Sequence, residues 1–348
     1  MLKSLFSYFK PHIKLFILDM FCAVMVAAID LSFPLISRHA MYDMLPDKTY
    51  GPFFALMLCV GCFYILRSLG QYLMTYLGHL FGVLVEADIR ASLFTHLQEL
   101  DFEFYDKNRT GKLMSRLTGD LFEITELAHH GPEDLLISTL TIIGSLSFMF
   151  YMEWRLAIIV AVLIPIFIAV VISRRRSMSE ASREVKRKLA GINADIETSL
   201  SGMKTSKAFA NEEVEHDRFT HSNDSYIAAR KAYFKTMGTF FAYQEFFMGI
   251  LPVVVITFGG YLIMKGSMNY IDLITFTLFV NTFVTPIRKL SQFAEIFASG
   301  MAGLRRFNEI MEIQPVVVEA DDAQPIRVVE GRIDINDISF SYNENSEV

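Results

Sequence analysis

The sequence predicts an all-α membrane protein, in which six transmembrane helices continue as long extensions beyond the bilayer and a short β fragment follows. Composition is the first reason: 52% of the 348 residues are hydrophobic, 20% are charged and the mean hydropathy is +0.35, too apolar for a soluble domain of this size. The second reason is the presence of six apolar runs close to or above the ~20 residues that a helix needs to cross a bilayer. The third is the alternation of short and long connections between these runs.

Each predicted crossing is an apolar run bounded by polar residues. The connections after the first, third and fifth runs are short, whereas those after the second and fourth, residues 81–134 and 174–239, are long and highly charged. We name residues 81–134 the first extension and residues 174–239 the second extension, and expect both on one side of the membrane. The predicted crossings are Ile13–Ser37, Pro52–Leu80, Leu135–Met152, Leu156–Ser173, Phe240–Met264 and Leu273–Phe293.

Basic residues gather where the crossings meet the long connections. Arg174, Arg175 and Arg176 directly follow the fourth crossing, and Arg305 and Arg306 follow the sixth. Because cytoplasmic flanks carry the positive excess, both extensions and both termini are expected to face the cytoplasm. The sequence thus predicts a multi-pass protein of the cell membrane.

Net charge and cysteine content argue against two other classes of protein. The net charge is −6, the pI is about 5.8 and the basic residues cluster only locally, so a nucleic-acid partner is not expected. Cys22, Cys59 and Cys62 all lie in apolar runs, which does not suit a disulfide framework. Cys59 and Cys62 have the spacing of a metal or redox pair but lack further ligands nearby, so we expect them to pack as apolar groups and expect no metal site.

Apolar residues recur at helical spacing within both extensions. After the fourth crossing, Leu189, Ile192, Ile196 and Leu200 are three or four residues apart, which indicates a coiled-coil-like helix in water. At about 1.5 Å per residue, about 25 extra residues would project about 40 Å beyond the bilayer. Such rods suit a transporter that is driven by a motor outside the membrane.

The first extension reverses direction at a tip that is rich in aromatic residues. Phe102, Phe104 and Tyr105 lie in this tip next to Asp106. Aromatic side chains at a solvated tip call for a partner surface, because exposed apolar patches mark interaction sites. The alternative is that these side chains fold back on their own extension.

The second extension reverses between Phe209 and Phe219. Four acidic residues lie between these two aromatic residues, Glu212, Glu213, Glu215 and Asp217. The segment is expected to form a short docking helix.

Four segments, in order along the chain, resemble those of ATP-binding cassette (ABC) exporters of the type I, or type IV, fold. The resemblance covers nearly the whole chain. Phe104–Asp106 with Thr110, Gly111, Ser115, Arg116 and Asp120 is similar to the first intracellular loop, Ile196–Phe209 with Glu212 and Phe219 to the second, Gly303–Ile310 to the end of the sixth helix, and Gly331–Ile335 with Ser339–Tyr342 to the opening strands of the nucleotide-binding domain.

The resemblance implies a domain organisation. Residues 1–12 would form an interfacial N-terminal helix, with Leu2, Leu5, Phe6 and Phe9 on one face, unless this terminus is frayed. Residues 13–313 would form the six-helix transmembrane domain, residues 314–330 a linker, and residues 331–348 the truncated start of a nucleotide-binding domain.

The resemblance also implies partners. Two such halves, identical or different, would pack as a domain-swapped dimer around a cavity that opens alternately to each side. Segments Phe102–Asn108 and Asn211–Asp217 would be coupling helices that dock on nucleotide-binding domains, with Phe102, Phe104, Tyr105, Asp106, Glu212, Glu213 and Glu215 as coupling residues.

Nucleotide chemistry is expected only in the intact protein. The sequence has no G-x-x-x-x-G-K-[ST] phosphate loop, and Gly111–Lys112 is part of the tip turn. This chain alone should therefore show no ATPase activity, and ATP and Mg²⁺ would bind only when the whole nucleotide-binding domain is present. Alternating apolar residues after Gly331 indicate a strand pair broken at Asn336–Asp337, and Tyr342 matches the family aromatic that stacks on adenine, although a half-buried edge tyrosine is the alternative.

Ionisable residues inside predicted crossings are candidates for the transport path. Asp19, Asp30, Arg67 and Glu245 qualify, and Asp30 and Arg67 lie at comparable depths, either as a structural ion pair or as a substrate contact. Pro286 should bend the sixth crossing, and Asp272 can cap its start. Phe276, Phe279 and Phe283 form a helical stripe that either packs internally or, with 31 Phe and 18 Met in the chain, lines an adaptable substrate cavity.

The leading functional hypothesis is an ATP-driven exporter of lipid-like, drug-like or other amphipathic substrates. An importer with the same fold, for example for metal chelates, remains an alternative. A secondary transporter or channel that uses Asp30, Arg67 and Glu245 for ion coupling is another, against which the long extensions argue. The last alternative is a truncated membrane protein that regulates a full-length partner.

Overall fold

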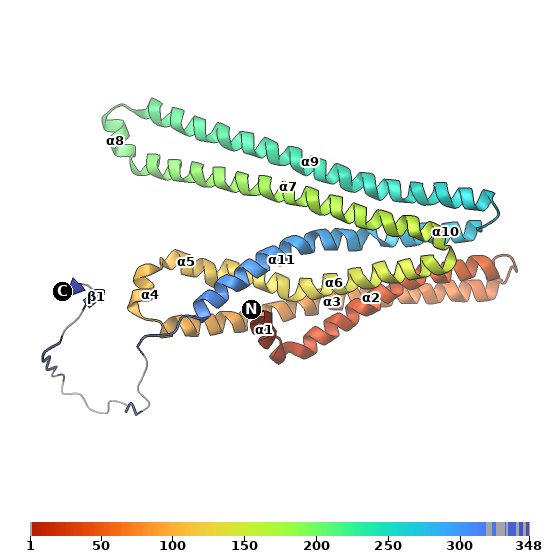
Figure 1. Cartoon of the computed structure of the whole chain (residues 1–348), viewed down its shortest axis with the longest axis horizontal. Coiled ribbons are helices and arrows are strands. Elements are labelled where there is room, and N and C mark those ends of the chain that lie inside the picture. The colour runs from red at the N-terminus through yellow and green to blue at the C-terminus, as the bar shows by residue number, and fades with distance from the viewer. Residues whose placement is uncertain are drawn as a thin grey trace.

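Long antiparallel helices form a single bundle that divides into two arms (Figure 1). The structure is a computed structural model that describes residues 2–317, 322–324, 331, 333–338, 341–343 and 346–347, with no side-chain description for Leu2 or for the last two of these ranges. The helices are α1 Leu2–Ser7, α2 Ile13–His39, α3 Tyr50–Glu99, α4 Phe102–Lys107, α5 Thr110–Ser115, α6 Leu121–Met152, α7 Trp154–Ser201, α8 Met203–Ala208, α9 Glu212–Met264, α10 Tyr270–Thr282 and α11 Val284–Met311, with a 3-10 turn at Lys10–His12 and π-helical turns at Ala40–Met44 and Arg116–Asp120.

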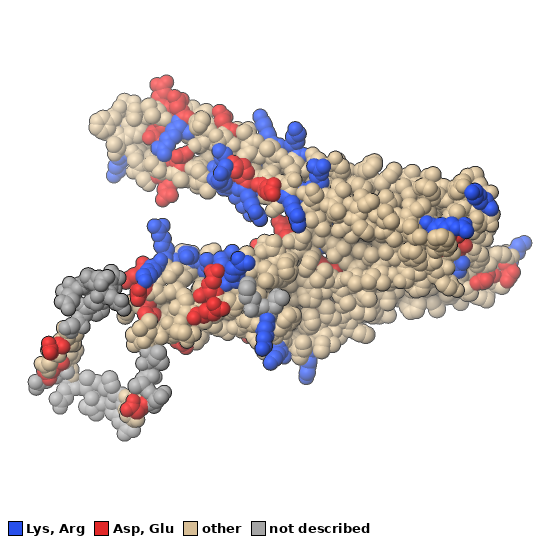
Figure 2. All heavy atoms as spheres, viewed as in Figure 1, with Lys and Arg blue, Asp and Glu red and all other residues tan. Residues whose placement is uncertain are grey.

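Six helical stretches in the described residues are long and apolar enough to cross a membrane, and each contains one predicted crossing. α3 has 50 residues, so it is about 75 Å long, more than twice the ~30 Å hydrocarbon core of a bilayer. Charged side chains are sparse over the undivided part of the bundle and gather on the two arms (Figure 2). The chain is therefore a multi-pass membrane protein with an all-α fold, as predicted.

The largest apolar core of the described residues is built mainly on α7, α9, α10 and α11, and a smaller one lies between α2, α3 and α6. α6 and α7 are separated only by Glu153, whose side chain accepts a hydrogen bond from the Arg155 amide and so caps α7. α10 and α11 are separated at Phe283, three residues before Pro286, which has no N–H to continue the helix. Where a bend at Pro286 was predicted, the helix is interrupted three residues before it.

The first arm has its own core at the place where α3, α6 and α11 meet. Phe81, Val85, Ile89 and Leu93 of α3 are buried there. Leu5 and Phe9 are also buried in this core, and the Phe9 ring lies edge-on to Phe81 at 4.9 Å. The N-terminal segment thus packs on the arm through two residues that we had assigned to an interfacial face, because these apolar side chains find a protein surface within reach.

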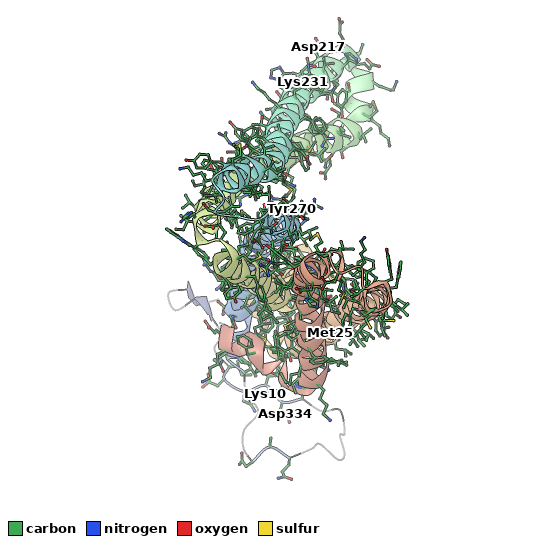
Figure 3. The ribbon with its side chains drawn as sticks, turned by 90° about the vertical axis from the view of Figure 1, so that its right-hand side faces the viewer. Lys10, Met25, Asp217, Lys231, Tyr270 and Asp334 are labelled. Atoms are coloured by element: carbon green, nitrogen blue, oxygen red, sulfur yellow. The ribbon has the colours of Figure 1, made fainter. Side chains whose placement is uncertain are left out.

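The second arm is the hairpin α7–α8–α9. It stands away from the other helices when the molecule is turned by 90°, with Asp217 and Lys231 at one end of the view and Lys10 at the other (Figure 3). The short helix at its tip is α8, Met203–Ala208, so the prediction of a docking helix over Asn211–Asp217 was wrong in position. Those residues form the start of α9, because Glu212, Glu213 and Glu215 favour the positive end of a helix dipole.

Two further expectations differ from the structure. Asn269, and not Asp272, caps α10 with its side chain, since Asp272 instead binds Arg38 Nε at 2.8 Å and the Tyr42 hydroxyl at 2.9 Å. The expected strand over 333–335 is absent among the described residues, and β1 Ser341–Asn343 pairs antiparallel with β2 Ser346–Glu347. Asp337 has a φ of 47°, as suits the predicted break at this position.

Candidate transport pathway and coupling surfaces

An ion pair joins α2 to α3 inside the predicted membrane crossings. Arg67 Nε lies 2.5 Å from Asp30 Oδ1, and Arg67 Nη2 donates to Asp30 Oδ2 at 2.9 Å. This two-point geometry neutralises both charges, which would be costly alone in lipid. The sequence correctly placed the two residues at one depth, and the structure brings them together.

A cavity of about 310 Å³ opens beside this pair. Tyr64, Asn281 and Thr285 contribute polar side chains to its wall, and Phe33, Ile137 and Leu278 contribute apolar ones. Asp30 and Arg67 also line it. Apolar and polar side chains thus share the wall, and such a mixed lining suits an amphipathic molecule.

The other predicted cavity residues lie elsewhere. Phe276, Phe279 and Phe283 are at most 1% exposed and belong to the core with α7 and α9, so the helical stripe packs internally in this conformation. Glu245 is exposed on α9 and forms no ion pair or hydrogen bond within the described part of the chain. Glu245 is not among the residues that line the cavity beside Asp30 and Arg67.

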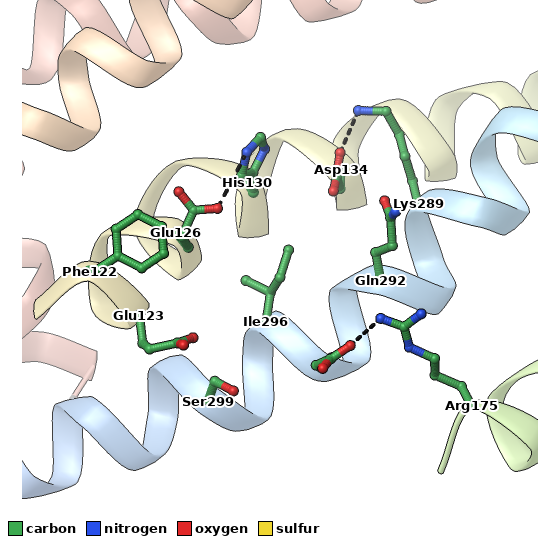
Figure 4. Close-up of a pocket in the computed structure, with 11 residues that line it drawn as sticks. Phe122, Glu123, Glu126, His130, Asp134, Arg175, Lys289, Gln292, Ile296 and Ser299 are labelled. Atoms are coloured by element: carbon green, nitrogen blue, oxygen red, sulfur yellow. Dashed lines mark hydrogen bonds and ion pairs between the residues drawn. The ribbon is translucent and has the colours of Figure 1, made fainter. Parts of the chain in front are cut away.

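A larger and more polar cavity, of about 480 Å³, lies where the arms diverge. Its wall is drawn in Figure 4, which shows α6 on one side, α11 on the other and Arg175 of α7 at the edge. Lys289 of α11 binds Asp134 and, at 3.3 Å, Glu133, both on α6. Arg175 binds Glu295 of α11. Ionic contacts therefore tie α11 to both neighbouring helices at this level.

Sequence analysis missed this group, although a signal was present. Lys289 lies inside the predicted sixth crossing, where a basic residue is a functional candidate by default. Glu133 and Asp134 directly precede the third crossing. Asp19, which was noted as ionisable within a crossing, is fully buried, and its carboxylate oxygens have no hydrogen-bond partner among the described residues.

The first tip presents its aromatic residues unequally. The Phe102 side chain is 91% exposed, whereas Phe104 packs against the core of the arm. The Tyr105 hydroxyl donates to the Leu97 carbonyl, which fixes α4 to the end of α3, and Asp106 is exposed. Phe104 and Tyr105 therefore fold back on their own extension, which is one of the two alternatives for this tip. Phe102 stays exposed, as the other alternative expects.

The second tip also combines exposed and anchored residues. Phe209 is 79% exposed beyond the end of α8. Glu212 and Glu213 are exposed in the first turn of α9, whereas Glu215 accepts a hydrogen bond from Ser199 of α7. Tyr342 lies in β1, and its side chain is outside the described residues.

Comparisons with known proteins agree with this architecture. Residues 16–287 match the family described as the ABC transporter transmembrane region. Over its whole length the chain is 34% identical to the uncharacterized ABC transporter ATP-binding protein YwjA of Bacillus subtilis (strain 168), of which it covers 60%.

More distant relatives include proteins with named activities. One is the ATP-dependent lipid A-core flippase of Syntrophus aciditrophicus (strain SB), 25% identical over 98% of this chain and 57% of the relative. Another is the putative multidrug export ATP-binding/permease protein YgaD of Bacillus subtilis (strain 168), 23% identical over 99% of this chain and 61% of the relative. The chain spans about 60% of the length of these relatives. With most of its residues matched, the chain belongs to the ABC transporter transmembrane region family, as an exporter-type transmembrane domain.

Proposed function

We propose that this chain is the membrane half of an ATP-driven exporter that moves lipid-like or other amphipathic substrates across the cell membrane by alternating access. The observation that carries the proposal is the pair of arms, which project far from the apolar bundle and end in exposed aromatic side chains. Phe102 begins α4 and Phe209 directly follows α8, the short helices at the ends of the two arms (Figure 1), and both side chains are exposed where a docked protein would bury them.

The proposal assigns the partners as follows. Both arms and both termini face the cytoplasm, and α4 and α8 dock on nucleotide-binding domains that bind ATP and Mg²⁺. A second half, identical or different, completes the transport cavity. The flippase and multidrug exporter among the relatives support an amphipathic substrate, and so does the mixed wall of the cavity next to Asp30 and Arg67.

The test uses protein from the complete reading frame, reconstituted in proteoliposomes with a fluorescent phospholipid analogue and ATP on one side only. Replacing Phe102 and Phe209 together by Ala should lower ATP-driven movement about tenfold or more, because buried aromatic anchors dominate docking energy. Tyr151→Ala is the matched control: Tyr151 is 88% exposed at the opposite end of the bundle, in the last turn of α6. Its variant should transport normally.

Three results would contradict the proposal. Unchanged transport in the Phe102→Ala/Phe209→Ala protein would remove the docking role of the tips. Accumulation of the analogue on the side that holds ATP would indicate an importer. Movement driven by an ion gradient without ATP would indicate a secondary transporter.

A further inference from the structure

Three histidine side chains converge between α3 and α6, close to where the first arm leaves the apolar bundle. His79 belongs to α3, and His129 and His130 belong to α6. One ligand atom from each ring lies within 4.8 Å of the others. The ring centroid of His79 lies 4.9 Å from that of His129 and 5.4 Å from that of His130. Only five other histidines occur in the chain, so three together form an unusual concentration.

Backbone hydrogen bonds fix the proton positions of two of these rings. Nδ1 of His79 lies 2.8 Å from the Thr75 carbonyl, and Nδ1 of His129 lies 2.9 Å from the Thr125 carbonyl. A carbonyl oxygen only accepts, so each Nδ1 must carry the proton, and each neutral ring offers the lone pair of Nε2. An Nδ1–H bound to a carbonyl is the arrangement by which proteins orient metal-ligating histidines.

The second observation is that His129 is 2% exposed and its Nε2 has no hydrogen-bond partner among the described residues. Leaving such a buried polar atom unpaired is costly, so the fold must supply a reason for it. The ring reaches this position because residue 82 is glycine: a Cβ there would lie 3.0 Å from His129 Nδ1. The packing of α3 on α6 thus accommodates an imidazole that has a free ligand atom.

We propose that His79, His129 and His130 bind one divalent transition-metal ion of the zinc class, with a fourth position open to water at the exposed edge formed by His79. Imidazole nitrogens suit Zn²⁺, Ni²⁺ and Cu²⁺ rather than Mg²⁺ or Ca²⁺. In a tetrahedral zinc site the ligand atoms lie about 3.3 Å apart, given Zn–N bonds of about 2.0 Å, so binding needs only a small approach of the rings. The ion would tie α3 to α6.

A neighbouring group of possible ligands is less suitable. His130, Glu133 and Asp134 also have ligand atoms within 4.8 Å of one another. Lys289, however, already binds both carboxylates, and its ammonium would repel a cation. Glu126 lies 3.7 Å from His130 Nε2 and can serve as an orienting partner of the three-histidine site. The inference does not depend on the direction or substrate of transport.

The experiment measures binding of Zn²⁺ alone to the complete protein in lipid nanodiscs, purified without a polyhistidine tag and titrated against a coloured chelator. One ion should bind per chain. His79→Gln and His130→Gln remove less buried ligands and leave the packed His129 in place. Each should weaken binding by more than about 100-fold, since even loss of an orienting partner weakens metal sites by 10–100-fold.

His216→Gln combined with His221→Gln is the matched control, because both of these histidines are exposed on α9. This variant should bind Zn²⁺ as the unaltered protein does. A second readout uses Co²⁺, whose visible absorption bands report tetrahedral nitrogen coordination and should vanish in His79→Gln. Binding that is equal in all variants, or no binding of the unaltered protein at micromolar Zn²⁺, would overturn the proposal.

Discussion

The two extensions have similar lengths but are stabilised differently. The first is closed by a third helix, because the end of α11 lies against both α3 and α6 and buries Leu304, Phe307 and Ile310. The second consists of the α7–α9 hairpin and its tip. Among residues 174–239 the only buried residues are Val185, Ile192 and Ala229. A third helix thus makes the difference between a packed arm and an open one.

In the second arm, the apolar residues that were singled out by their helical spacing are exposed. Leu189, Ile196 and Leu200 continue the row of Ile192 along α7, yet all three are exposed. A two-helix hairpin has one contact line, so the remaining apolar side chains have no protein surface to cover them. The proposed second transporter half would supply that surface, as α11 does in the first arm.

The largest contrast is expected from removing one leucine in each arm. Leu93→Ala deletes a fully buried side chain of the first arm and should lower the free energy of unfolding by about 2–5 kcal/mol. Leu189→Ala changes an exposed residue of the second arm and should change the free energy of unfolding by less than about 0.5 kcal/mol in the isolated chain. Thermal unfolding in detergent micelles measures both.

The two leucine variants also test whether a second transporter half covers the second arm. In the fully assembled protein, Leu189→Ala should become destabilising if a second half covers the arm. A loss of stability in the isolated chain as large as that of Leu93→Ala would show that the second arm is packed already.

A smaller contrast is expected from adding one methyl group in each arm. At Gly300 of α11, a Cβ would lie 2.5 Å from the Cβ of Leu127 and 2.8 Å from the Glu123 carbonyl oxygen, so Gly300→Ala should separate α11 from α6 and cost about 1–3 kcal/mol. At Gly191 of α7 an added Cβ would meet no atom of the described residues within 4 Å, apart from its own helix backbone. Gly191→Ala should therefore stabilise the helix by roughly 0.5–1 kcal/mol.

If this interpretation is correct, Gly300→Ala lowers the unfolding temperature and Gly191→Ala raises it. If Gly300→Ala unfolds at the original temperature, the close approach of α6 and α11 is not required for stability.

Sequence periodicity was sufficient for the helices but not for their neighbours. The apolar runs and their spacing predicted the six crossings and the rods, because these features depend on local sequence. The pair Asp30–Arg67 was predictable because two isolated charges in neighbouring crossings need each other. By contrast, the burial of Phe276 and of Leu5 depends on which helices pack against them, and local periodicity does not show which helices these are.

One cap was predicted three residues from its observed position, and one tip helix eight residues from it. The short helix of the second tip was predicted at Asn211–Asp217 and lies at Met203–Ala208, since the acidic residues that looked like a solvated tip are also good first-turn residues for α9. The histidine site was missed because His79 lies 50 residues from His129, and only the packing of α3 on α6 brings them together.

The smallest contrast concerns one acidic residue in each arm. Asp120, beyond the predicted crossings, accepts hydrogen bonds from Arg306 Nε at 2.7 Å and from Arg116 Nη1 at 2.8 Å, and it is nearly buried. Asp120→Asn should cost about 1–2 kcal/mol. Asp195 of the second arm accepts hydrogen bonds from Arg218 at 3.0 Å and from Ser222 at a partly exposed site, so Asp195→Asn should lower the unfolding temperature less than Asp120→Asn does.

The pH dependence of the stability lost in Asp120→Asn tests whether the charge of Asp120 is the cause of that loss. Burial works to raise the pKa of the Asp120 carboxyl, but the guanidinium groups of Arg306 and Arg116 outweigh it and hold the pKa below its usual value. A carboxyl whose pKa is lowered on folding contributes stability above the unfolded pKa of about 3.9, and loses it as the pH falls through the folded value. The gap in unfolding temperature between the unaltered protein and Asp120→Asn should therefore be constant from pH 7 to about pH 5 and shrink below about pH 4. If the difference in unfolding temperature is as large at pH 3 as at pH 7, Asp120 acts through its shape and neutral hydrogen bonds, and not through its charge.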